Sequence, residues 1–128
     1  MNSPLVKRKR VMQVEYDFIK DGGAVGELEL RGGILPPGAL VDFSLLDVQT
    51  GLTSGGAATA ALSLVSAADV KDEAALTSYT TGTKACNPNK TATNSVKISE
   101  STKLKLTIAI APLTAGKFVA VLEYFVTE

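Results

Sequence analysis

The sequence predicts an all-β protein, an antiparallel β-sandwich or jelly-roll-like fold of about seven strands. Apolar and polar residues alternate with a period of two in one segment after another, which is typical of strands with one buried face. Turn-forming residues separate these segments about every 8–12 residues. The helices that a flavodoxin-like α/β fold needs are missing. The chain has 128 residues, the size of one domain, and it lacks Trp, so Ala, Val and Leu are expected to fill the core.

The first half of the chain is expected to contribute four strands, over Val11–Ile19, Ala24–Leu30, Ala39–Val48 and Ala57–Val65. The segment KDGG, Lys20–Gly23, predicts a hairpin turn between the first two strands, because Asp-Gly tolerates positive φ angles. Arg31–Gly38 contains three Gly and two Pro residues and is predicted to be a corner. Gln49–Gly56 is predicted to be a loop with Leu52 at its tip.

The second half is expected to begin with a short helical insertion. Ala67–Leu76 is rich in helix formers, but it is too short to be stable unless it packs on the body. Tyr79–Asn94 is polar and rich in turn formers, and we expect an end loop here that faces a partner, with Tyr79 as its aromatic residue. The remaining strands are predicted over Ser95–Ser99, Lys103–Ala111 and Lys117–Thr127, with a turn at Pro112–Gly116 between the last two.

The last predicted strand is apolar on both faces. Phe118 and every second residue after it lie on one face, which fills the sandwich. Val119, Val121 and Phe125 lie on the other face. They must be covered by the helical insertion, by the N-terminal strand or by another subunit. These three residues are therefore a candidate self-interface.

Charge is unevenly distributed along the chain, although 13 basic and 13 acidic residues balance overall. Four basic residues form one block, Lys7, Arg8, Lys9 and Arg10. We predict an N-terminal arm over residues 1–10 and a single sandwich domain over residues 11–128. The arm is either solvated or bound to an acidic partner. No aromatic residue is interleaved with the block, so we expect no nucleic-acid partner.

Few residues of the chain are suited to catalysis or metal binding. There is no His, and Cys86 is the only cysteine. This composition excludes Ser-His-Asp and Cys-His arrangements, zinc sites built from several Cys, and an intrachain disulfide. The glycine-rich stretches lack the Lys-Ser/Thr of a P-loop. We expect no enzyme activity and no catalytic, cofactor-binding or metal site. The longest apolar run, Leu106–Leu113, is too short to span a bilayer, so we expect no membrane partner.

Four motifs occur in order along the chain and resemble those of small structural proteins of tailed bacteriophages. They are DGGAVG at Asp21–Gly26, LPPGA at Leu35–Ala39, DVQTGLTSGGAAT at Asp47–Thr59 and LTAGKF at Leu113–Phe118. The last motif leads into an aliphatic and aromatic strand. The similarity covers most of residues 16–126, but Tyr79–Asn94 matches no motif of the group.

The resemblance implies a virion structural protein, either a capsid decoration (cement) protein or the base of a head fibre. It implies a position on the capsid surface, a contact between Lys7–Arg10 and the major capsid protein, and a homo-oligomer, with a trimer favoured. Leu52 and the loop carrying Tyr79 are then expected at the two ends of the sandwich. The alternative is a module of a head fibre or tail that binds a host surface or glycan through its end loops.

Overall fold

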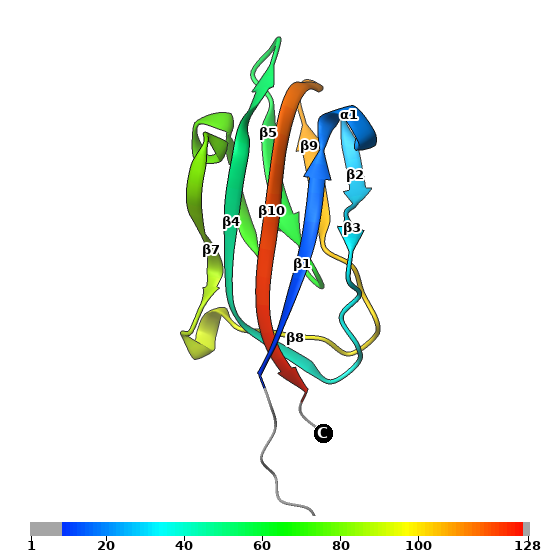
Figure 1. The fold of residues 1–128 in the computed structure, drawn as a ribbon, viewed down its shortest axis with the longest axis vertical. Coiled ribbons are helices and arrows are strands. Elements are labelled where there is room, and N and C mark those ends of the chain that lie inside the picture. The colour runs from blue at the N-terminus through cyan, green and yellow to red at the C-terminus, as the bar shows by residue number, and fades with distance from the viewer. Residues whose placement is uncertain (1–8, 127–128) are drawn as a thin grey trace, which may run out of the picture.

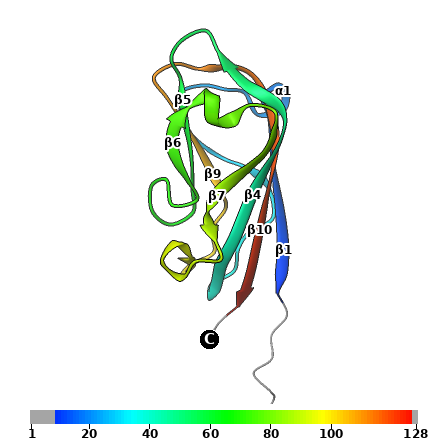
Figure 2. The ribbon, with the colours of Figure 1, turned by 90° about the vertical axis from the view of Figure 1, so that its left-hand side faces the viewer.

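The computed structural model describes residues 9–126 and contains two β-sheets packed face to face (Figures 1 and 2). Sheet A has the order β3-β1-β10-β4-β7, and β8 also pairs with β4. Its strands are β1 (Arg10–Asp17), β3 (Arg31–Gly32), β4 (Ala39–Ser54), β7 (Gly82–Asn89), β8 (Val96–Lys97) and β10 (Leu113–Val126). The antiparallel sandwich predicted from the sequence is confirmed.

Sheet B is smaller and has the order β2-β9-β5-β6. Its strands are β2 (Gly26–Glu29), β5 (Thr59–Ser63), β6 (Lys71–Ala75) and β9 (Lys105–Ala109). Three single-turn helical segments complete the described chain, namely α1 (Phe18–Asp21), η1 (Leu76–Tyr79) and η2 (Ala92–Asn94).

The core lies between the two sheets and follows the alternation in the sequence. In β1, Met12, Val14 and Tyr16 are buried, while the residues between them face outward. In β10, Phe118 occupies the equivalent inner position, and its ring centroid lies 5.5 Å from that of Tyr16. Leu106 of β9 is also fully buried, on the opposite layer. The inner faces of both sheets therefore form one continuous hydrophobic core.

The hairpin predicted at KDGG and the turn predicted before the last strand are instead connections between the sheets. β1 pairs with β10 in sheet A, whereas β2 pairs with β9 in sheet B, so KDGG does not join paired strands. Residues 18–21 form α1, and the Asp17 side chain caps it by accepting from the Ile19 N–H at 3.0 Å. Similarly, β9 and β10 belong to different sheets. The short segments between these strands cross from one layer to the other.

The predicted helical insertion over Ala67–Leu76 is wrong, because its second half forms edge strand β6, paired with β5. The turn before β6 explains the difference. The Asp69 carboxylate accepts hydrogen bonds from the backbone N–H groups of Leu64, Val65 and Ser66, at 2.7–2.9 Å. This turn directs the following residues back along β5. A helix of this length would have had little stability of its own.

Both residues predicted in end loops are buried. Leu52 is only 4 % exposed and belongs to β4, which continues to Ser54 instead of ending at Val48. Tyr79 is fully buried in η1, and its hydroxyl donates to the Ala60 carbonyl at 3.1 Å. The segment predicted as an irregular loop contains β7, and Cys86 lies buried within that strand.

Candidate interaction surface on sheet A

The outer face of sheet A is centred on β10, which lies between β1 and β4 (Figure 1). The side chains that point outward along β10 are Lys117, Val119, Val121, Glu123 and Phe125, and each is partly exposed. No strand or helix within residues 9–126 forms a third layer over this face (Figure 2). The structure therefore brings the three predicted interface residues onto one open sheet face and covers them with no other described element.

The two central rows of this face differ in charge. In the strand register, Val119 lies between Glu15 of β1 and Asp47 of β4. Two residues further along β10, Val121 lies between Gln13 and Leu45. The centre of the face therefore combines an apolar row on β10 with carboxylates on both sides of Val119.

Aromatic and basic residues gather at the end of the face near the C-terminus of β10. The Lys9 ammonium lies 2.6 Å from an oxygen of Asp42 and 3.8 Å from an oxygen of Glu123, and 5.8 Å from the centre of the Phe125 ring. Lys90 lies 5.5 Å from the centre of the Phe43 ring, in β4. Cationic side chains therefore already occupy positions over the aromatic residues of this region.

Two of the four basic residues predicted for the arm belong to the body of the sandwich. Arg10 is the first residue of β1 and pairs with Tyr124. Lys9 makes ion pairs within its own chain. Lys7 and Arg8 lie outside the described residues. A contact between this block and a partner remains a prediction.

β1 lies between β10 and β3, and an ion-pair cluster links it to β3. Arg31 bonds to Asp21 at 2.7 and 2.9 Å and to Glu15 at 2.9 Å, so it joins α1, β1 and β3. The hydrogen bond from Arg31 lowers the pKa of the Asp21 carboxyl, and the same bond raises the pKa of the guanidinium.

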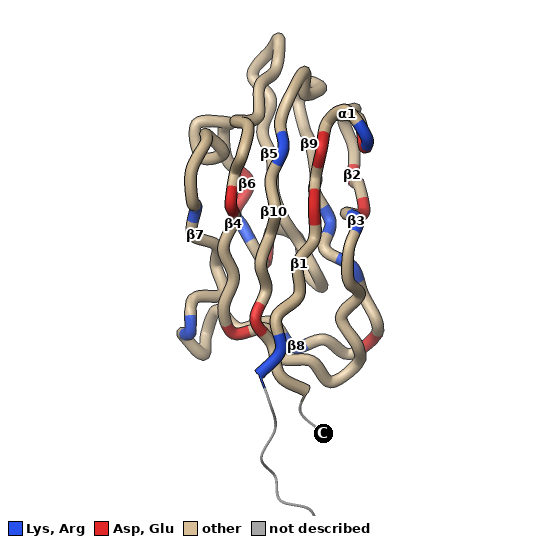
Figure 3. Tube along the Cα trace, viewed as in Figure 1, with Lys and Arg blue, Asp and Glu red and all other residues tan. Residues whose placement is uncertain are grey.

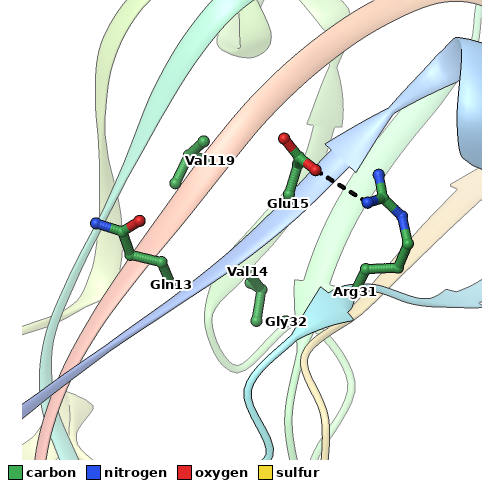
Figure 4. Close-up of a pocket in the computed structure, with 6 residues that line it drawn as sticks. All are labelled: Gln13, Val14, Glu15, Arg31, Gly32 and Val119. Atoms are coloured by element: carbon green, nitrogen blue, oxygen red, sulfur yellow. Dashed lines mark hydrogen bonds and ion pairs between the residues drawn. The ribbon is translucent and has the colours of Figure 1, made fainter.

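A shallow hollow of about 280 Å³ lies beside this cluster (Figure 4). Figure 4 shows Glu15 reaching Arg31 across it, with Gln13 and Val119 at its other side. Because the guanidinium already bonds to two carboxylates, it is poorly placed to bind an anion there. We assign no ligand to this hollow.

The titratable groups of the core serve packing. Burial raises the pKa of Tyr16 to about 12, and its hydroxyl donates to the Gly22 carbonyl at 2.7 Å. Burial likewise raises the pKa of the Cys86 thiol to about 11, which leaves it protonated and unreactive near neutral pH. Within residues 9–126, no three His, Cys, Asp or Glu side chains gather in a way that could hold a metal ion. The described helices include none long and apolar enough to cross a membrane.

These features define an all-β sandwich whose most distinctive surface is an open, partly apolar sheet face. Three solved phage structures contain a chain with this fold. One is the capsid asymmetric unit of cyanophage Pam1, with a TM-score of 0.67 and 17 % identity over 99 % of this chain and 91 % of that chain. Another is the capsid of Ralstonia phage GP4, with a TM-score of 0.62 and 20 % identity over 99 % and 90 %.

A third match is the acid-stable capsid of Helicobacter pylori bacteriophage KHP30. Its TM-score is 0.61, with 15 % identity over 96 % of this chain and 95 % of that chain. At these identities the likeness concerns the fold. By sequence, no family model and no curated protein matches the chain.

Proposed function

We propose that this chain is a virion structural protein without enzyme activity, and that it acts as a capsid decoration (cement) protein on the phage head shell. The observation that carries the proposal is the fold, which is shared over 96–99 % of this chain with chains of three phage capsid structures. The major capsid protein is its proposed partner, and the surface of the head is its proposed location.

The lengths of the matched chains support a decoration role. Each is covered over 90–95 % of its own length, so it is little longer than this chain. This chain therefore resembles whole small chains of those assemblies. A decoration protein is a small chain separate from the major capsid protein, so the likeness supports this role. The partly apolar face of sheet A also gives the sandwich a surface suited to a protein partner.

The two ends of the sandwich differ in charge, which supports a particular orientation on the shell. Residues 51–58, 76–82 and 108–116 contain no charged side chain, and they lie at the end away from the termini, where α1 contributes the charged residues Lys20 and Asp21 (Figures 1 and 3). At the opposite end, β1 begins and β10 ends beside Arg10 and Lys97. We place the shell contact at this charged end. Because Lys9 is paired within its own chain, Lys7, Arg8 and Arg10 are the residues proposed to contact acidic groups of the capsid protein.

The structure gives no support to the alternative of a glycan-binding head-fibre or tail module. Sugar recognition by an end loop would rely on an aromatic side chain, and Tyr79 was the candidate. Its ring is fully buried and its hydroxyl is bonded to the Ala60 carbonyl. We therefore retain the decoration role alone.

The proposal is tested by adding the purified chain to head shells of the phage that encodes it, assembled without this chain. We expect saturable co-sedimentation and a higher temperature of shell disruption, because a ligand that binds only the intact shell stabilises it. Shells that neither bind the chain nor gain heat resistance would rule the decoration role out.

Charge-reversal variants test the contact at the charged end. The double change Lys7→Glu and Arg8→Glu is expected to weaken shell binding at least about tenfold at low salt. Lys20→Glu with Lys103→Glu makes the same charge change elsewhere on the sandwich and should bind like the unmodified chain. Equal binding by both variants would refute the contact at Lys7 and Arg8 while leaving the decoration role intact.

A further inference from the structure

We propose that two copies of this chain pack face to face through the outer face of sheet A. The twofold axis crosses β10 near Ala120 and runs perpendicular to the strand, so that the two β10 strands lie antiparallel. This inference concerns an interaction surface and its symmetry, and it goes beyond the proposed attachment to a shell. Its occupant is a second copy of the chain.

The charge pattern along β10 is self-complementary. The outward residues run Lys117, Val119, Val121, Glu123. A twofold axis at Ala120 superimposes Val119 on Val121 and brings Lys117 of each copy to Glu123 of the other. Each contact occurs twice, because the interface is isologous.

The two charged groups are available for this pairing. Lys117 makes no ion pair among residues 9–126. Glu123 is 3.8 Å from Lys9, whereas Lys9 lies much closer to Asp42, at 2.6 Å. Glu123 therefore has a weak internal partner and can accept a second cation from another copy.

A twofold axis parallel to the strands is disfavoured by the same pattern. It would place Lys117 against Lys117 and Glu123 against Glu123. It would also place Glu15 of one copy against Asp47 of the other, since these residues flank Val119 on opposite sides. Like charges brought together in an interface strongly disfavour that arrangement. With the perpendicular axis, the row of Glu15 and Asp47 faces the row of Gln13 and Leu45.

A trimer, which the resemblance implies, would not use this face in the same way. A threefold ring is heterologous, so it joins two different patches and cannot place one flat sheet face against itself. The charge complementarity lies within a single face, and for that reason a twofold pair fits it better.

The size of the face sets the expected affinity. Four strands, β1, β10, β4 and β7, and about nine residues along β10 cover about 20 by 30 Å, or roughly 600 Å² per copy. This area is near the lower limit for specific interfaces. We therefore expect a reversible dimer with a dissociation constant in the micromolar range, so the measurement must cover about 1–100 μM.

The test is sedimentation equilibrium of the purified chain and four variants. They are Lys117→Glu, Glu123→Lys, the double exchange of both residues, and the control Lys20→Glu on the exposed part of α1. We expect a dimer for the unmodified chain and the control. Each single exchange should weaken dimerisation at least about tenfold, because it replaces two attractive contacts by two repulsive ones. The double exchange should restore the affinity to within about threefold.

A monomer throughout this concentration range, a trimer, or a double exchange no tighter than the single ones would overturn the proposal. All substitutions change exposed or partly exposed surface residues, and circular dichroism confirms that each variant folds. Shell binding is measured separately, so a failed dimer leaves the decoration role standing, and a failed shell assay leaves the dimer standing.

Discussion

Single polar side chains fix the turns that give this sandwich its connections. The clearest is Asp69, whose two carboxylate oxygens accept three backbone N–H groups, from Leu64, Val65 and Ser66. The N–H of Leu64 lies in a partly buried setting, where loss of its acceptor is costly. Ala68, directly before Asp69, has a positive φ of 57°. The hydrogen bonds of Asp69 hold the turn in which this unusual conformation occurs.

Replacing Asp69 should therefore destabilise the fold more than its partial exposure suggests. We expect Asp69→Ala to lower the free energy of unfolding by about 1–2 kcal/mol, since three backbone donors lose a charged acceptor. Urea denaturation at neutral pH measures the change. Glu27→Ala is the control, because Glu27 is exposed on the edge strand β2. A loss no larger than that of the control would show that the turn does not depend on Asp69.

The ion-pair cluster around Arg31 makes stability depend on pH. Folding lowers the pKa of Asp21 from 3.8, mainly through its hydrogen bond with Arg31. The ionised carboxylate is thus favoured by the folded state. The stabilisation is fully present above about pH 4 and is lost as the pH falls through the lower pKa of the folded state.

The corresponding experiment compares Asp21→Asn with the unmodified chain by urea denaturation between about pH 7 and pH 2. We expect the unmodified chain to be more stable at neutral pH and this advantage to shrink below about pH 4. Arg31→Gln should reduce the effect of Asp21→Asn, because it removes the main cause of the shift. An advantage that is independent of pH would contradict a role for the ionised carboxylate.

At the scale of the strand, β10 has two faces with different tasks. Phe118 is fully buried and contacts Tyr16, whereas its neighbour Val119 is partly exposed on the open face. Phe118→Ala should lower the free energy of unfolding by about 3–5 kcal/mol. Val119→Ala should lower the free energy of unfolding by less than about 1 kcal/mol, because the partly exposed Val119 side chain buries little apolar area. Chemical denaturation at low protein concentration measures both changes. If the two variants lose similar free energy of unfolding, Val119 is buried within the chain and the outer face is not open.

The elements that the sequence predicted well are those whose pattern is local. Alternation in β1 and β10 is a property of neighbouring residues, so it identifies both strands and their buried faces. Which sheet a strand joins depends on distant partners. KDGG satisfies the chemistry of a hairpin turn, yet β1 pairs with β10 and β2 with β9. The strand β6 was missed because its helix-forming composition is overridden by pairing with β5.

The candidate surface was predicted in part. The position of Val119, Val121 and Phe125 on one face of the last strand follows directly from a period of two. Their flanking residues, Glu15 and Asp47, come from strands far apart in the sequence, and the strand register alone brings them together. Leu52 was misplaced because Gly51 and Gly55 suggested a loop, whereas β4 continues between them as a strand of 16 residues.

At the scale of the whole molecule, the sandwich combines two surfaces with separate proposed tasks. The charged end beside β8 is proposed to contact a shell, and the open face of sheet A is proposed to pair with a second copy. The opposite end, where residues 51–58, 76–82 and 108–116 carry no charged side chain, is proposed to face away from the shell. In the core, the hydroxyl groups of Tyr16 and Tyr79 donate to backbone carbonyls of the same chain.

The most direct test of the central claim is an electron cryo-microscopy map of the head of the phage that encodes this chain. We predict density for this two-sheet sandwich on the outer surface of the shell, with the end where β1 begins and β10 ends against the major capsid protein. A head whose outer surface lacks the sandwich would contradict the decoration role.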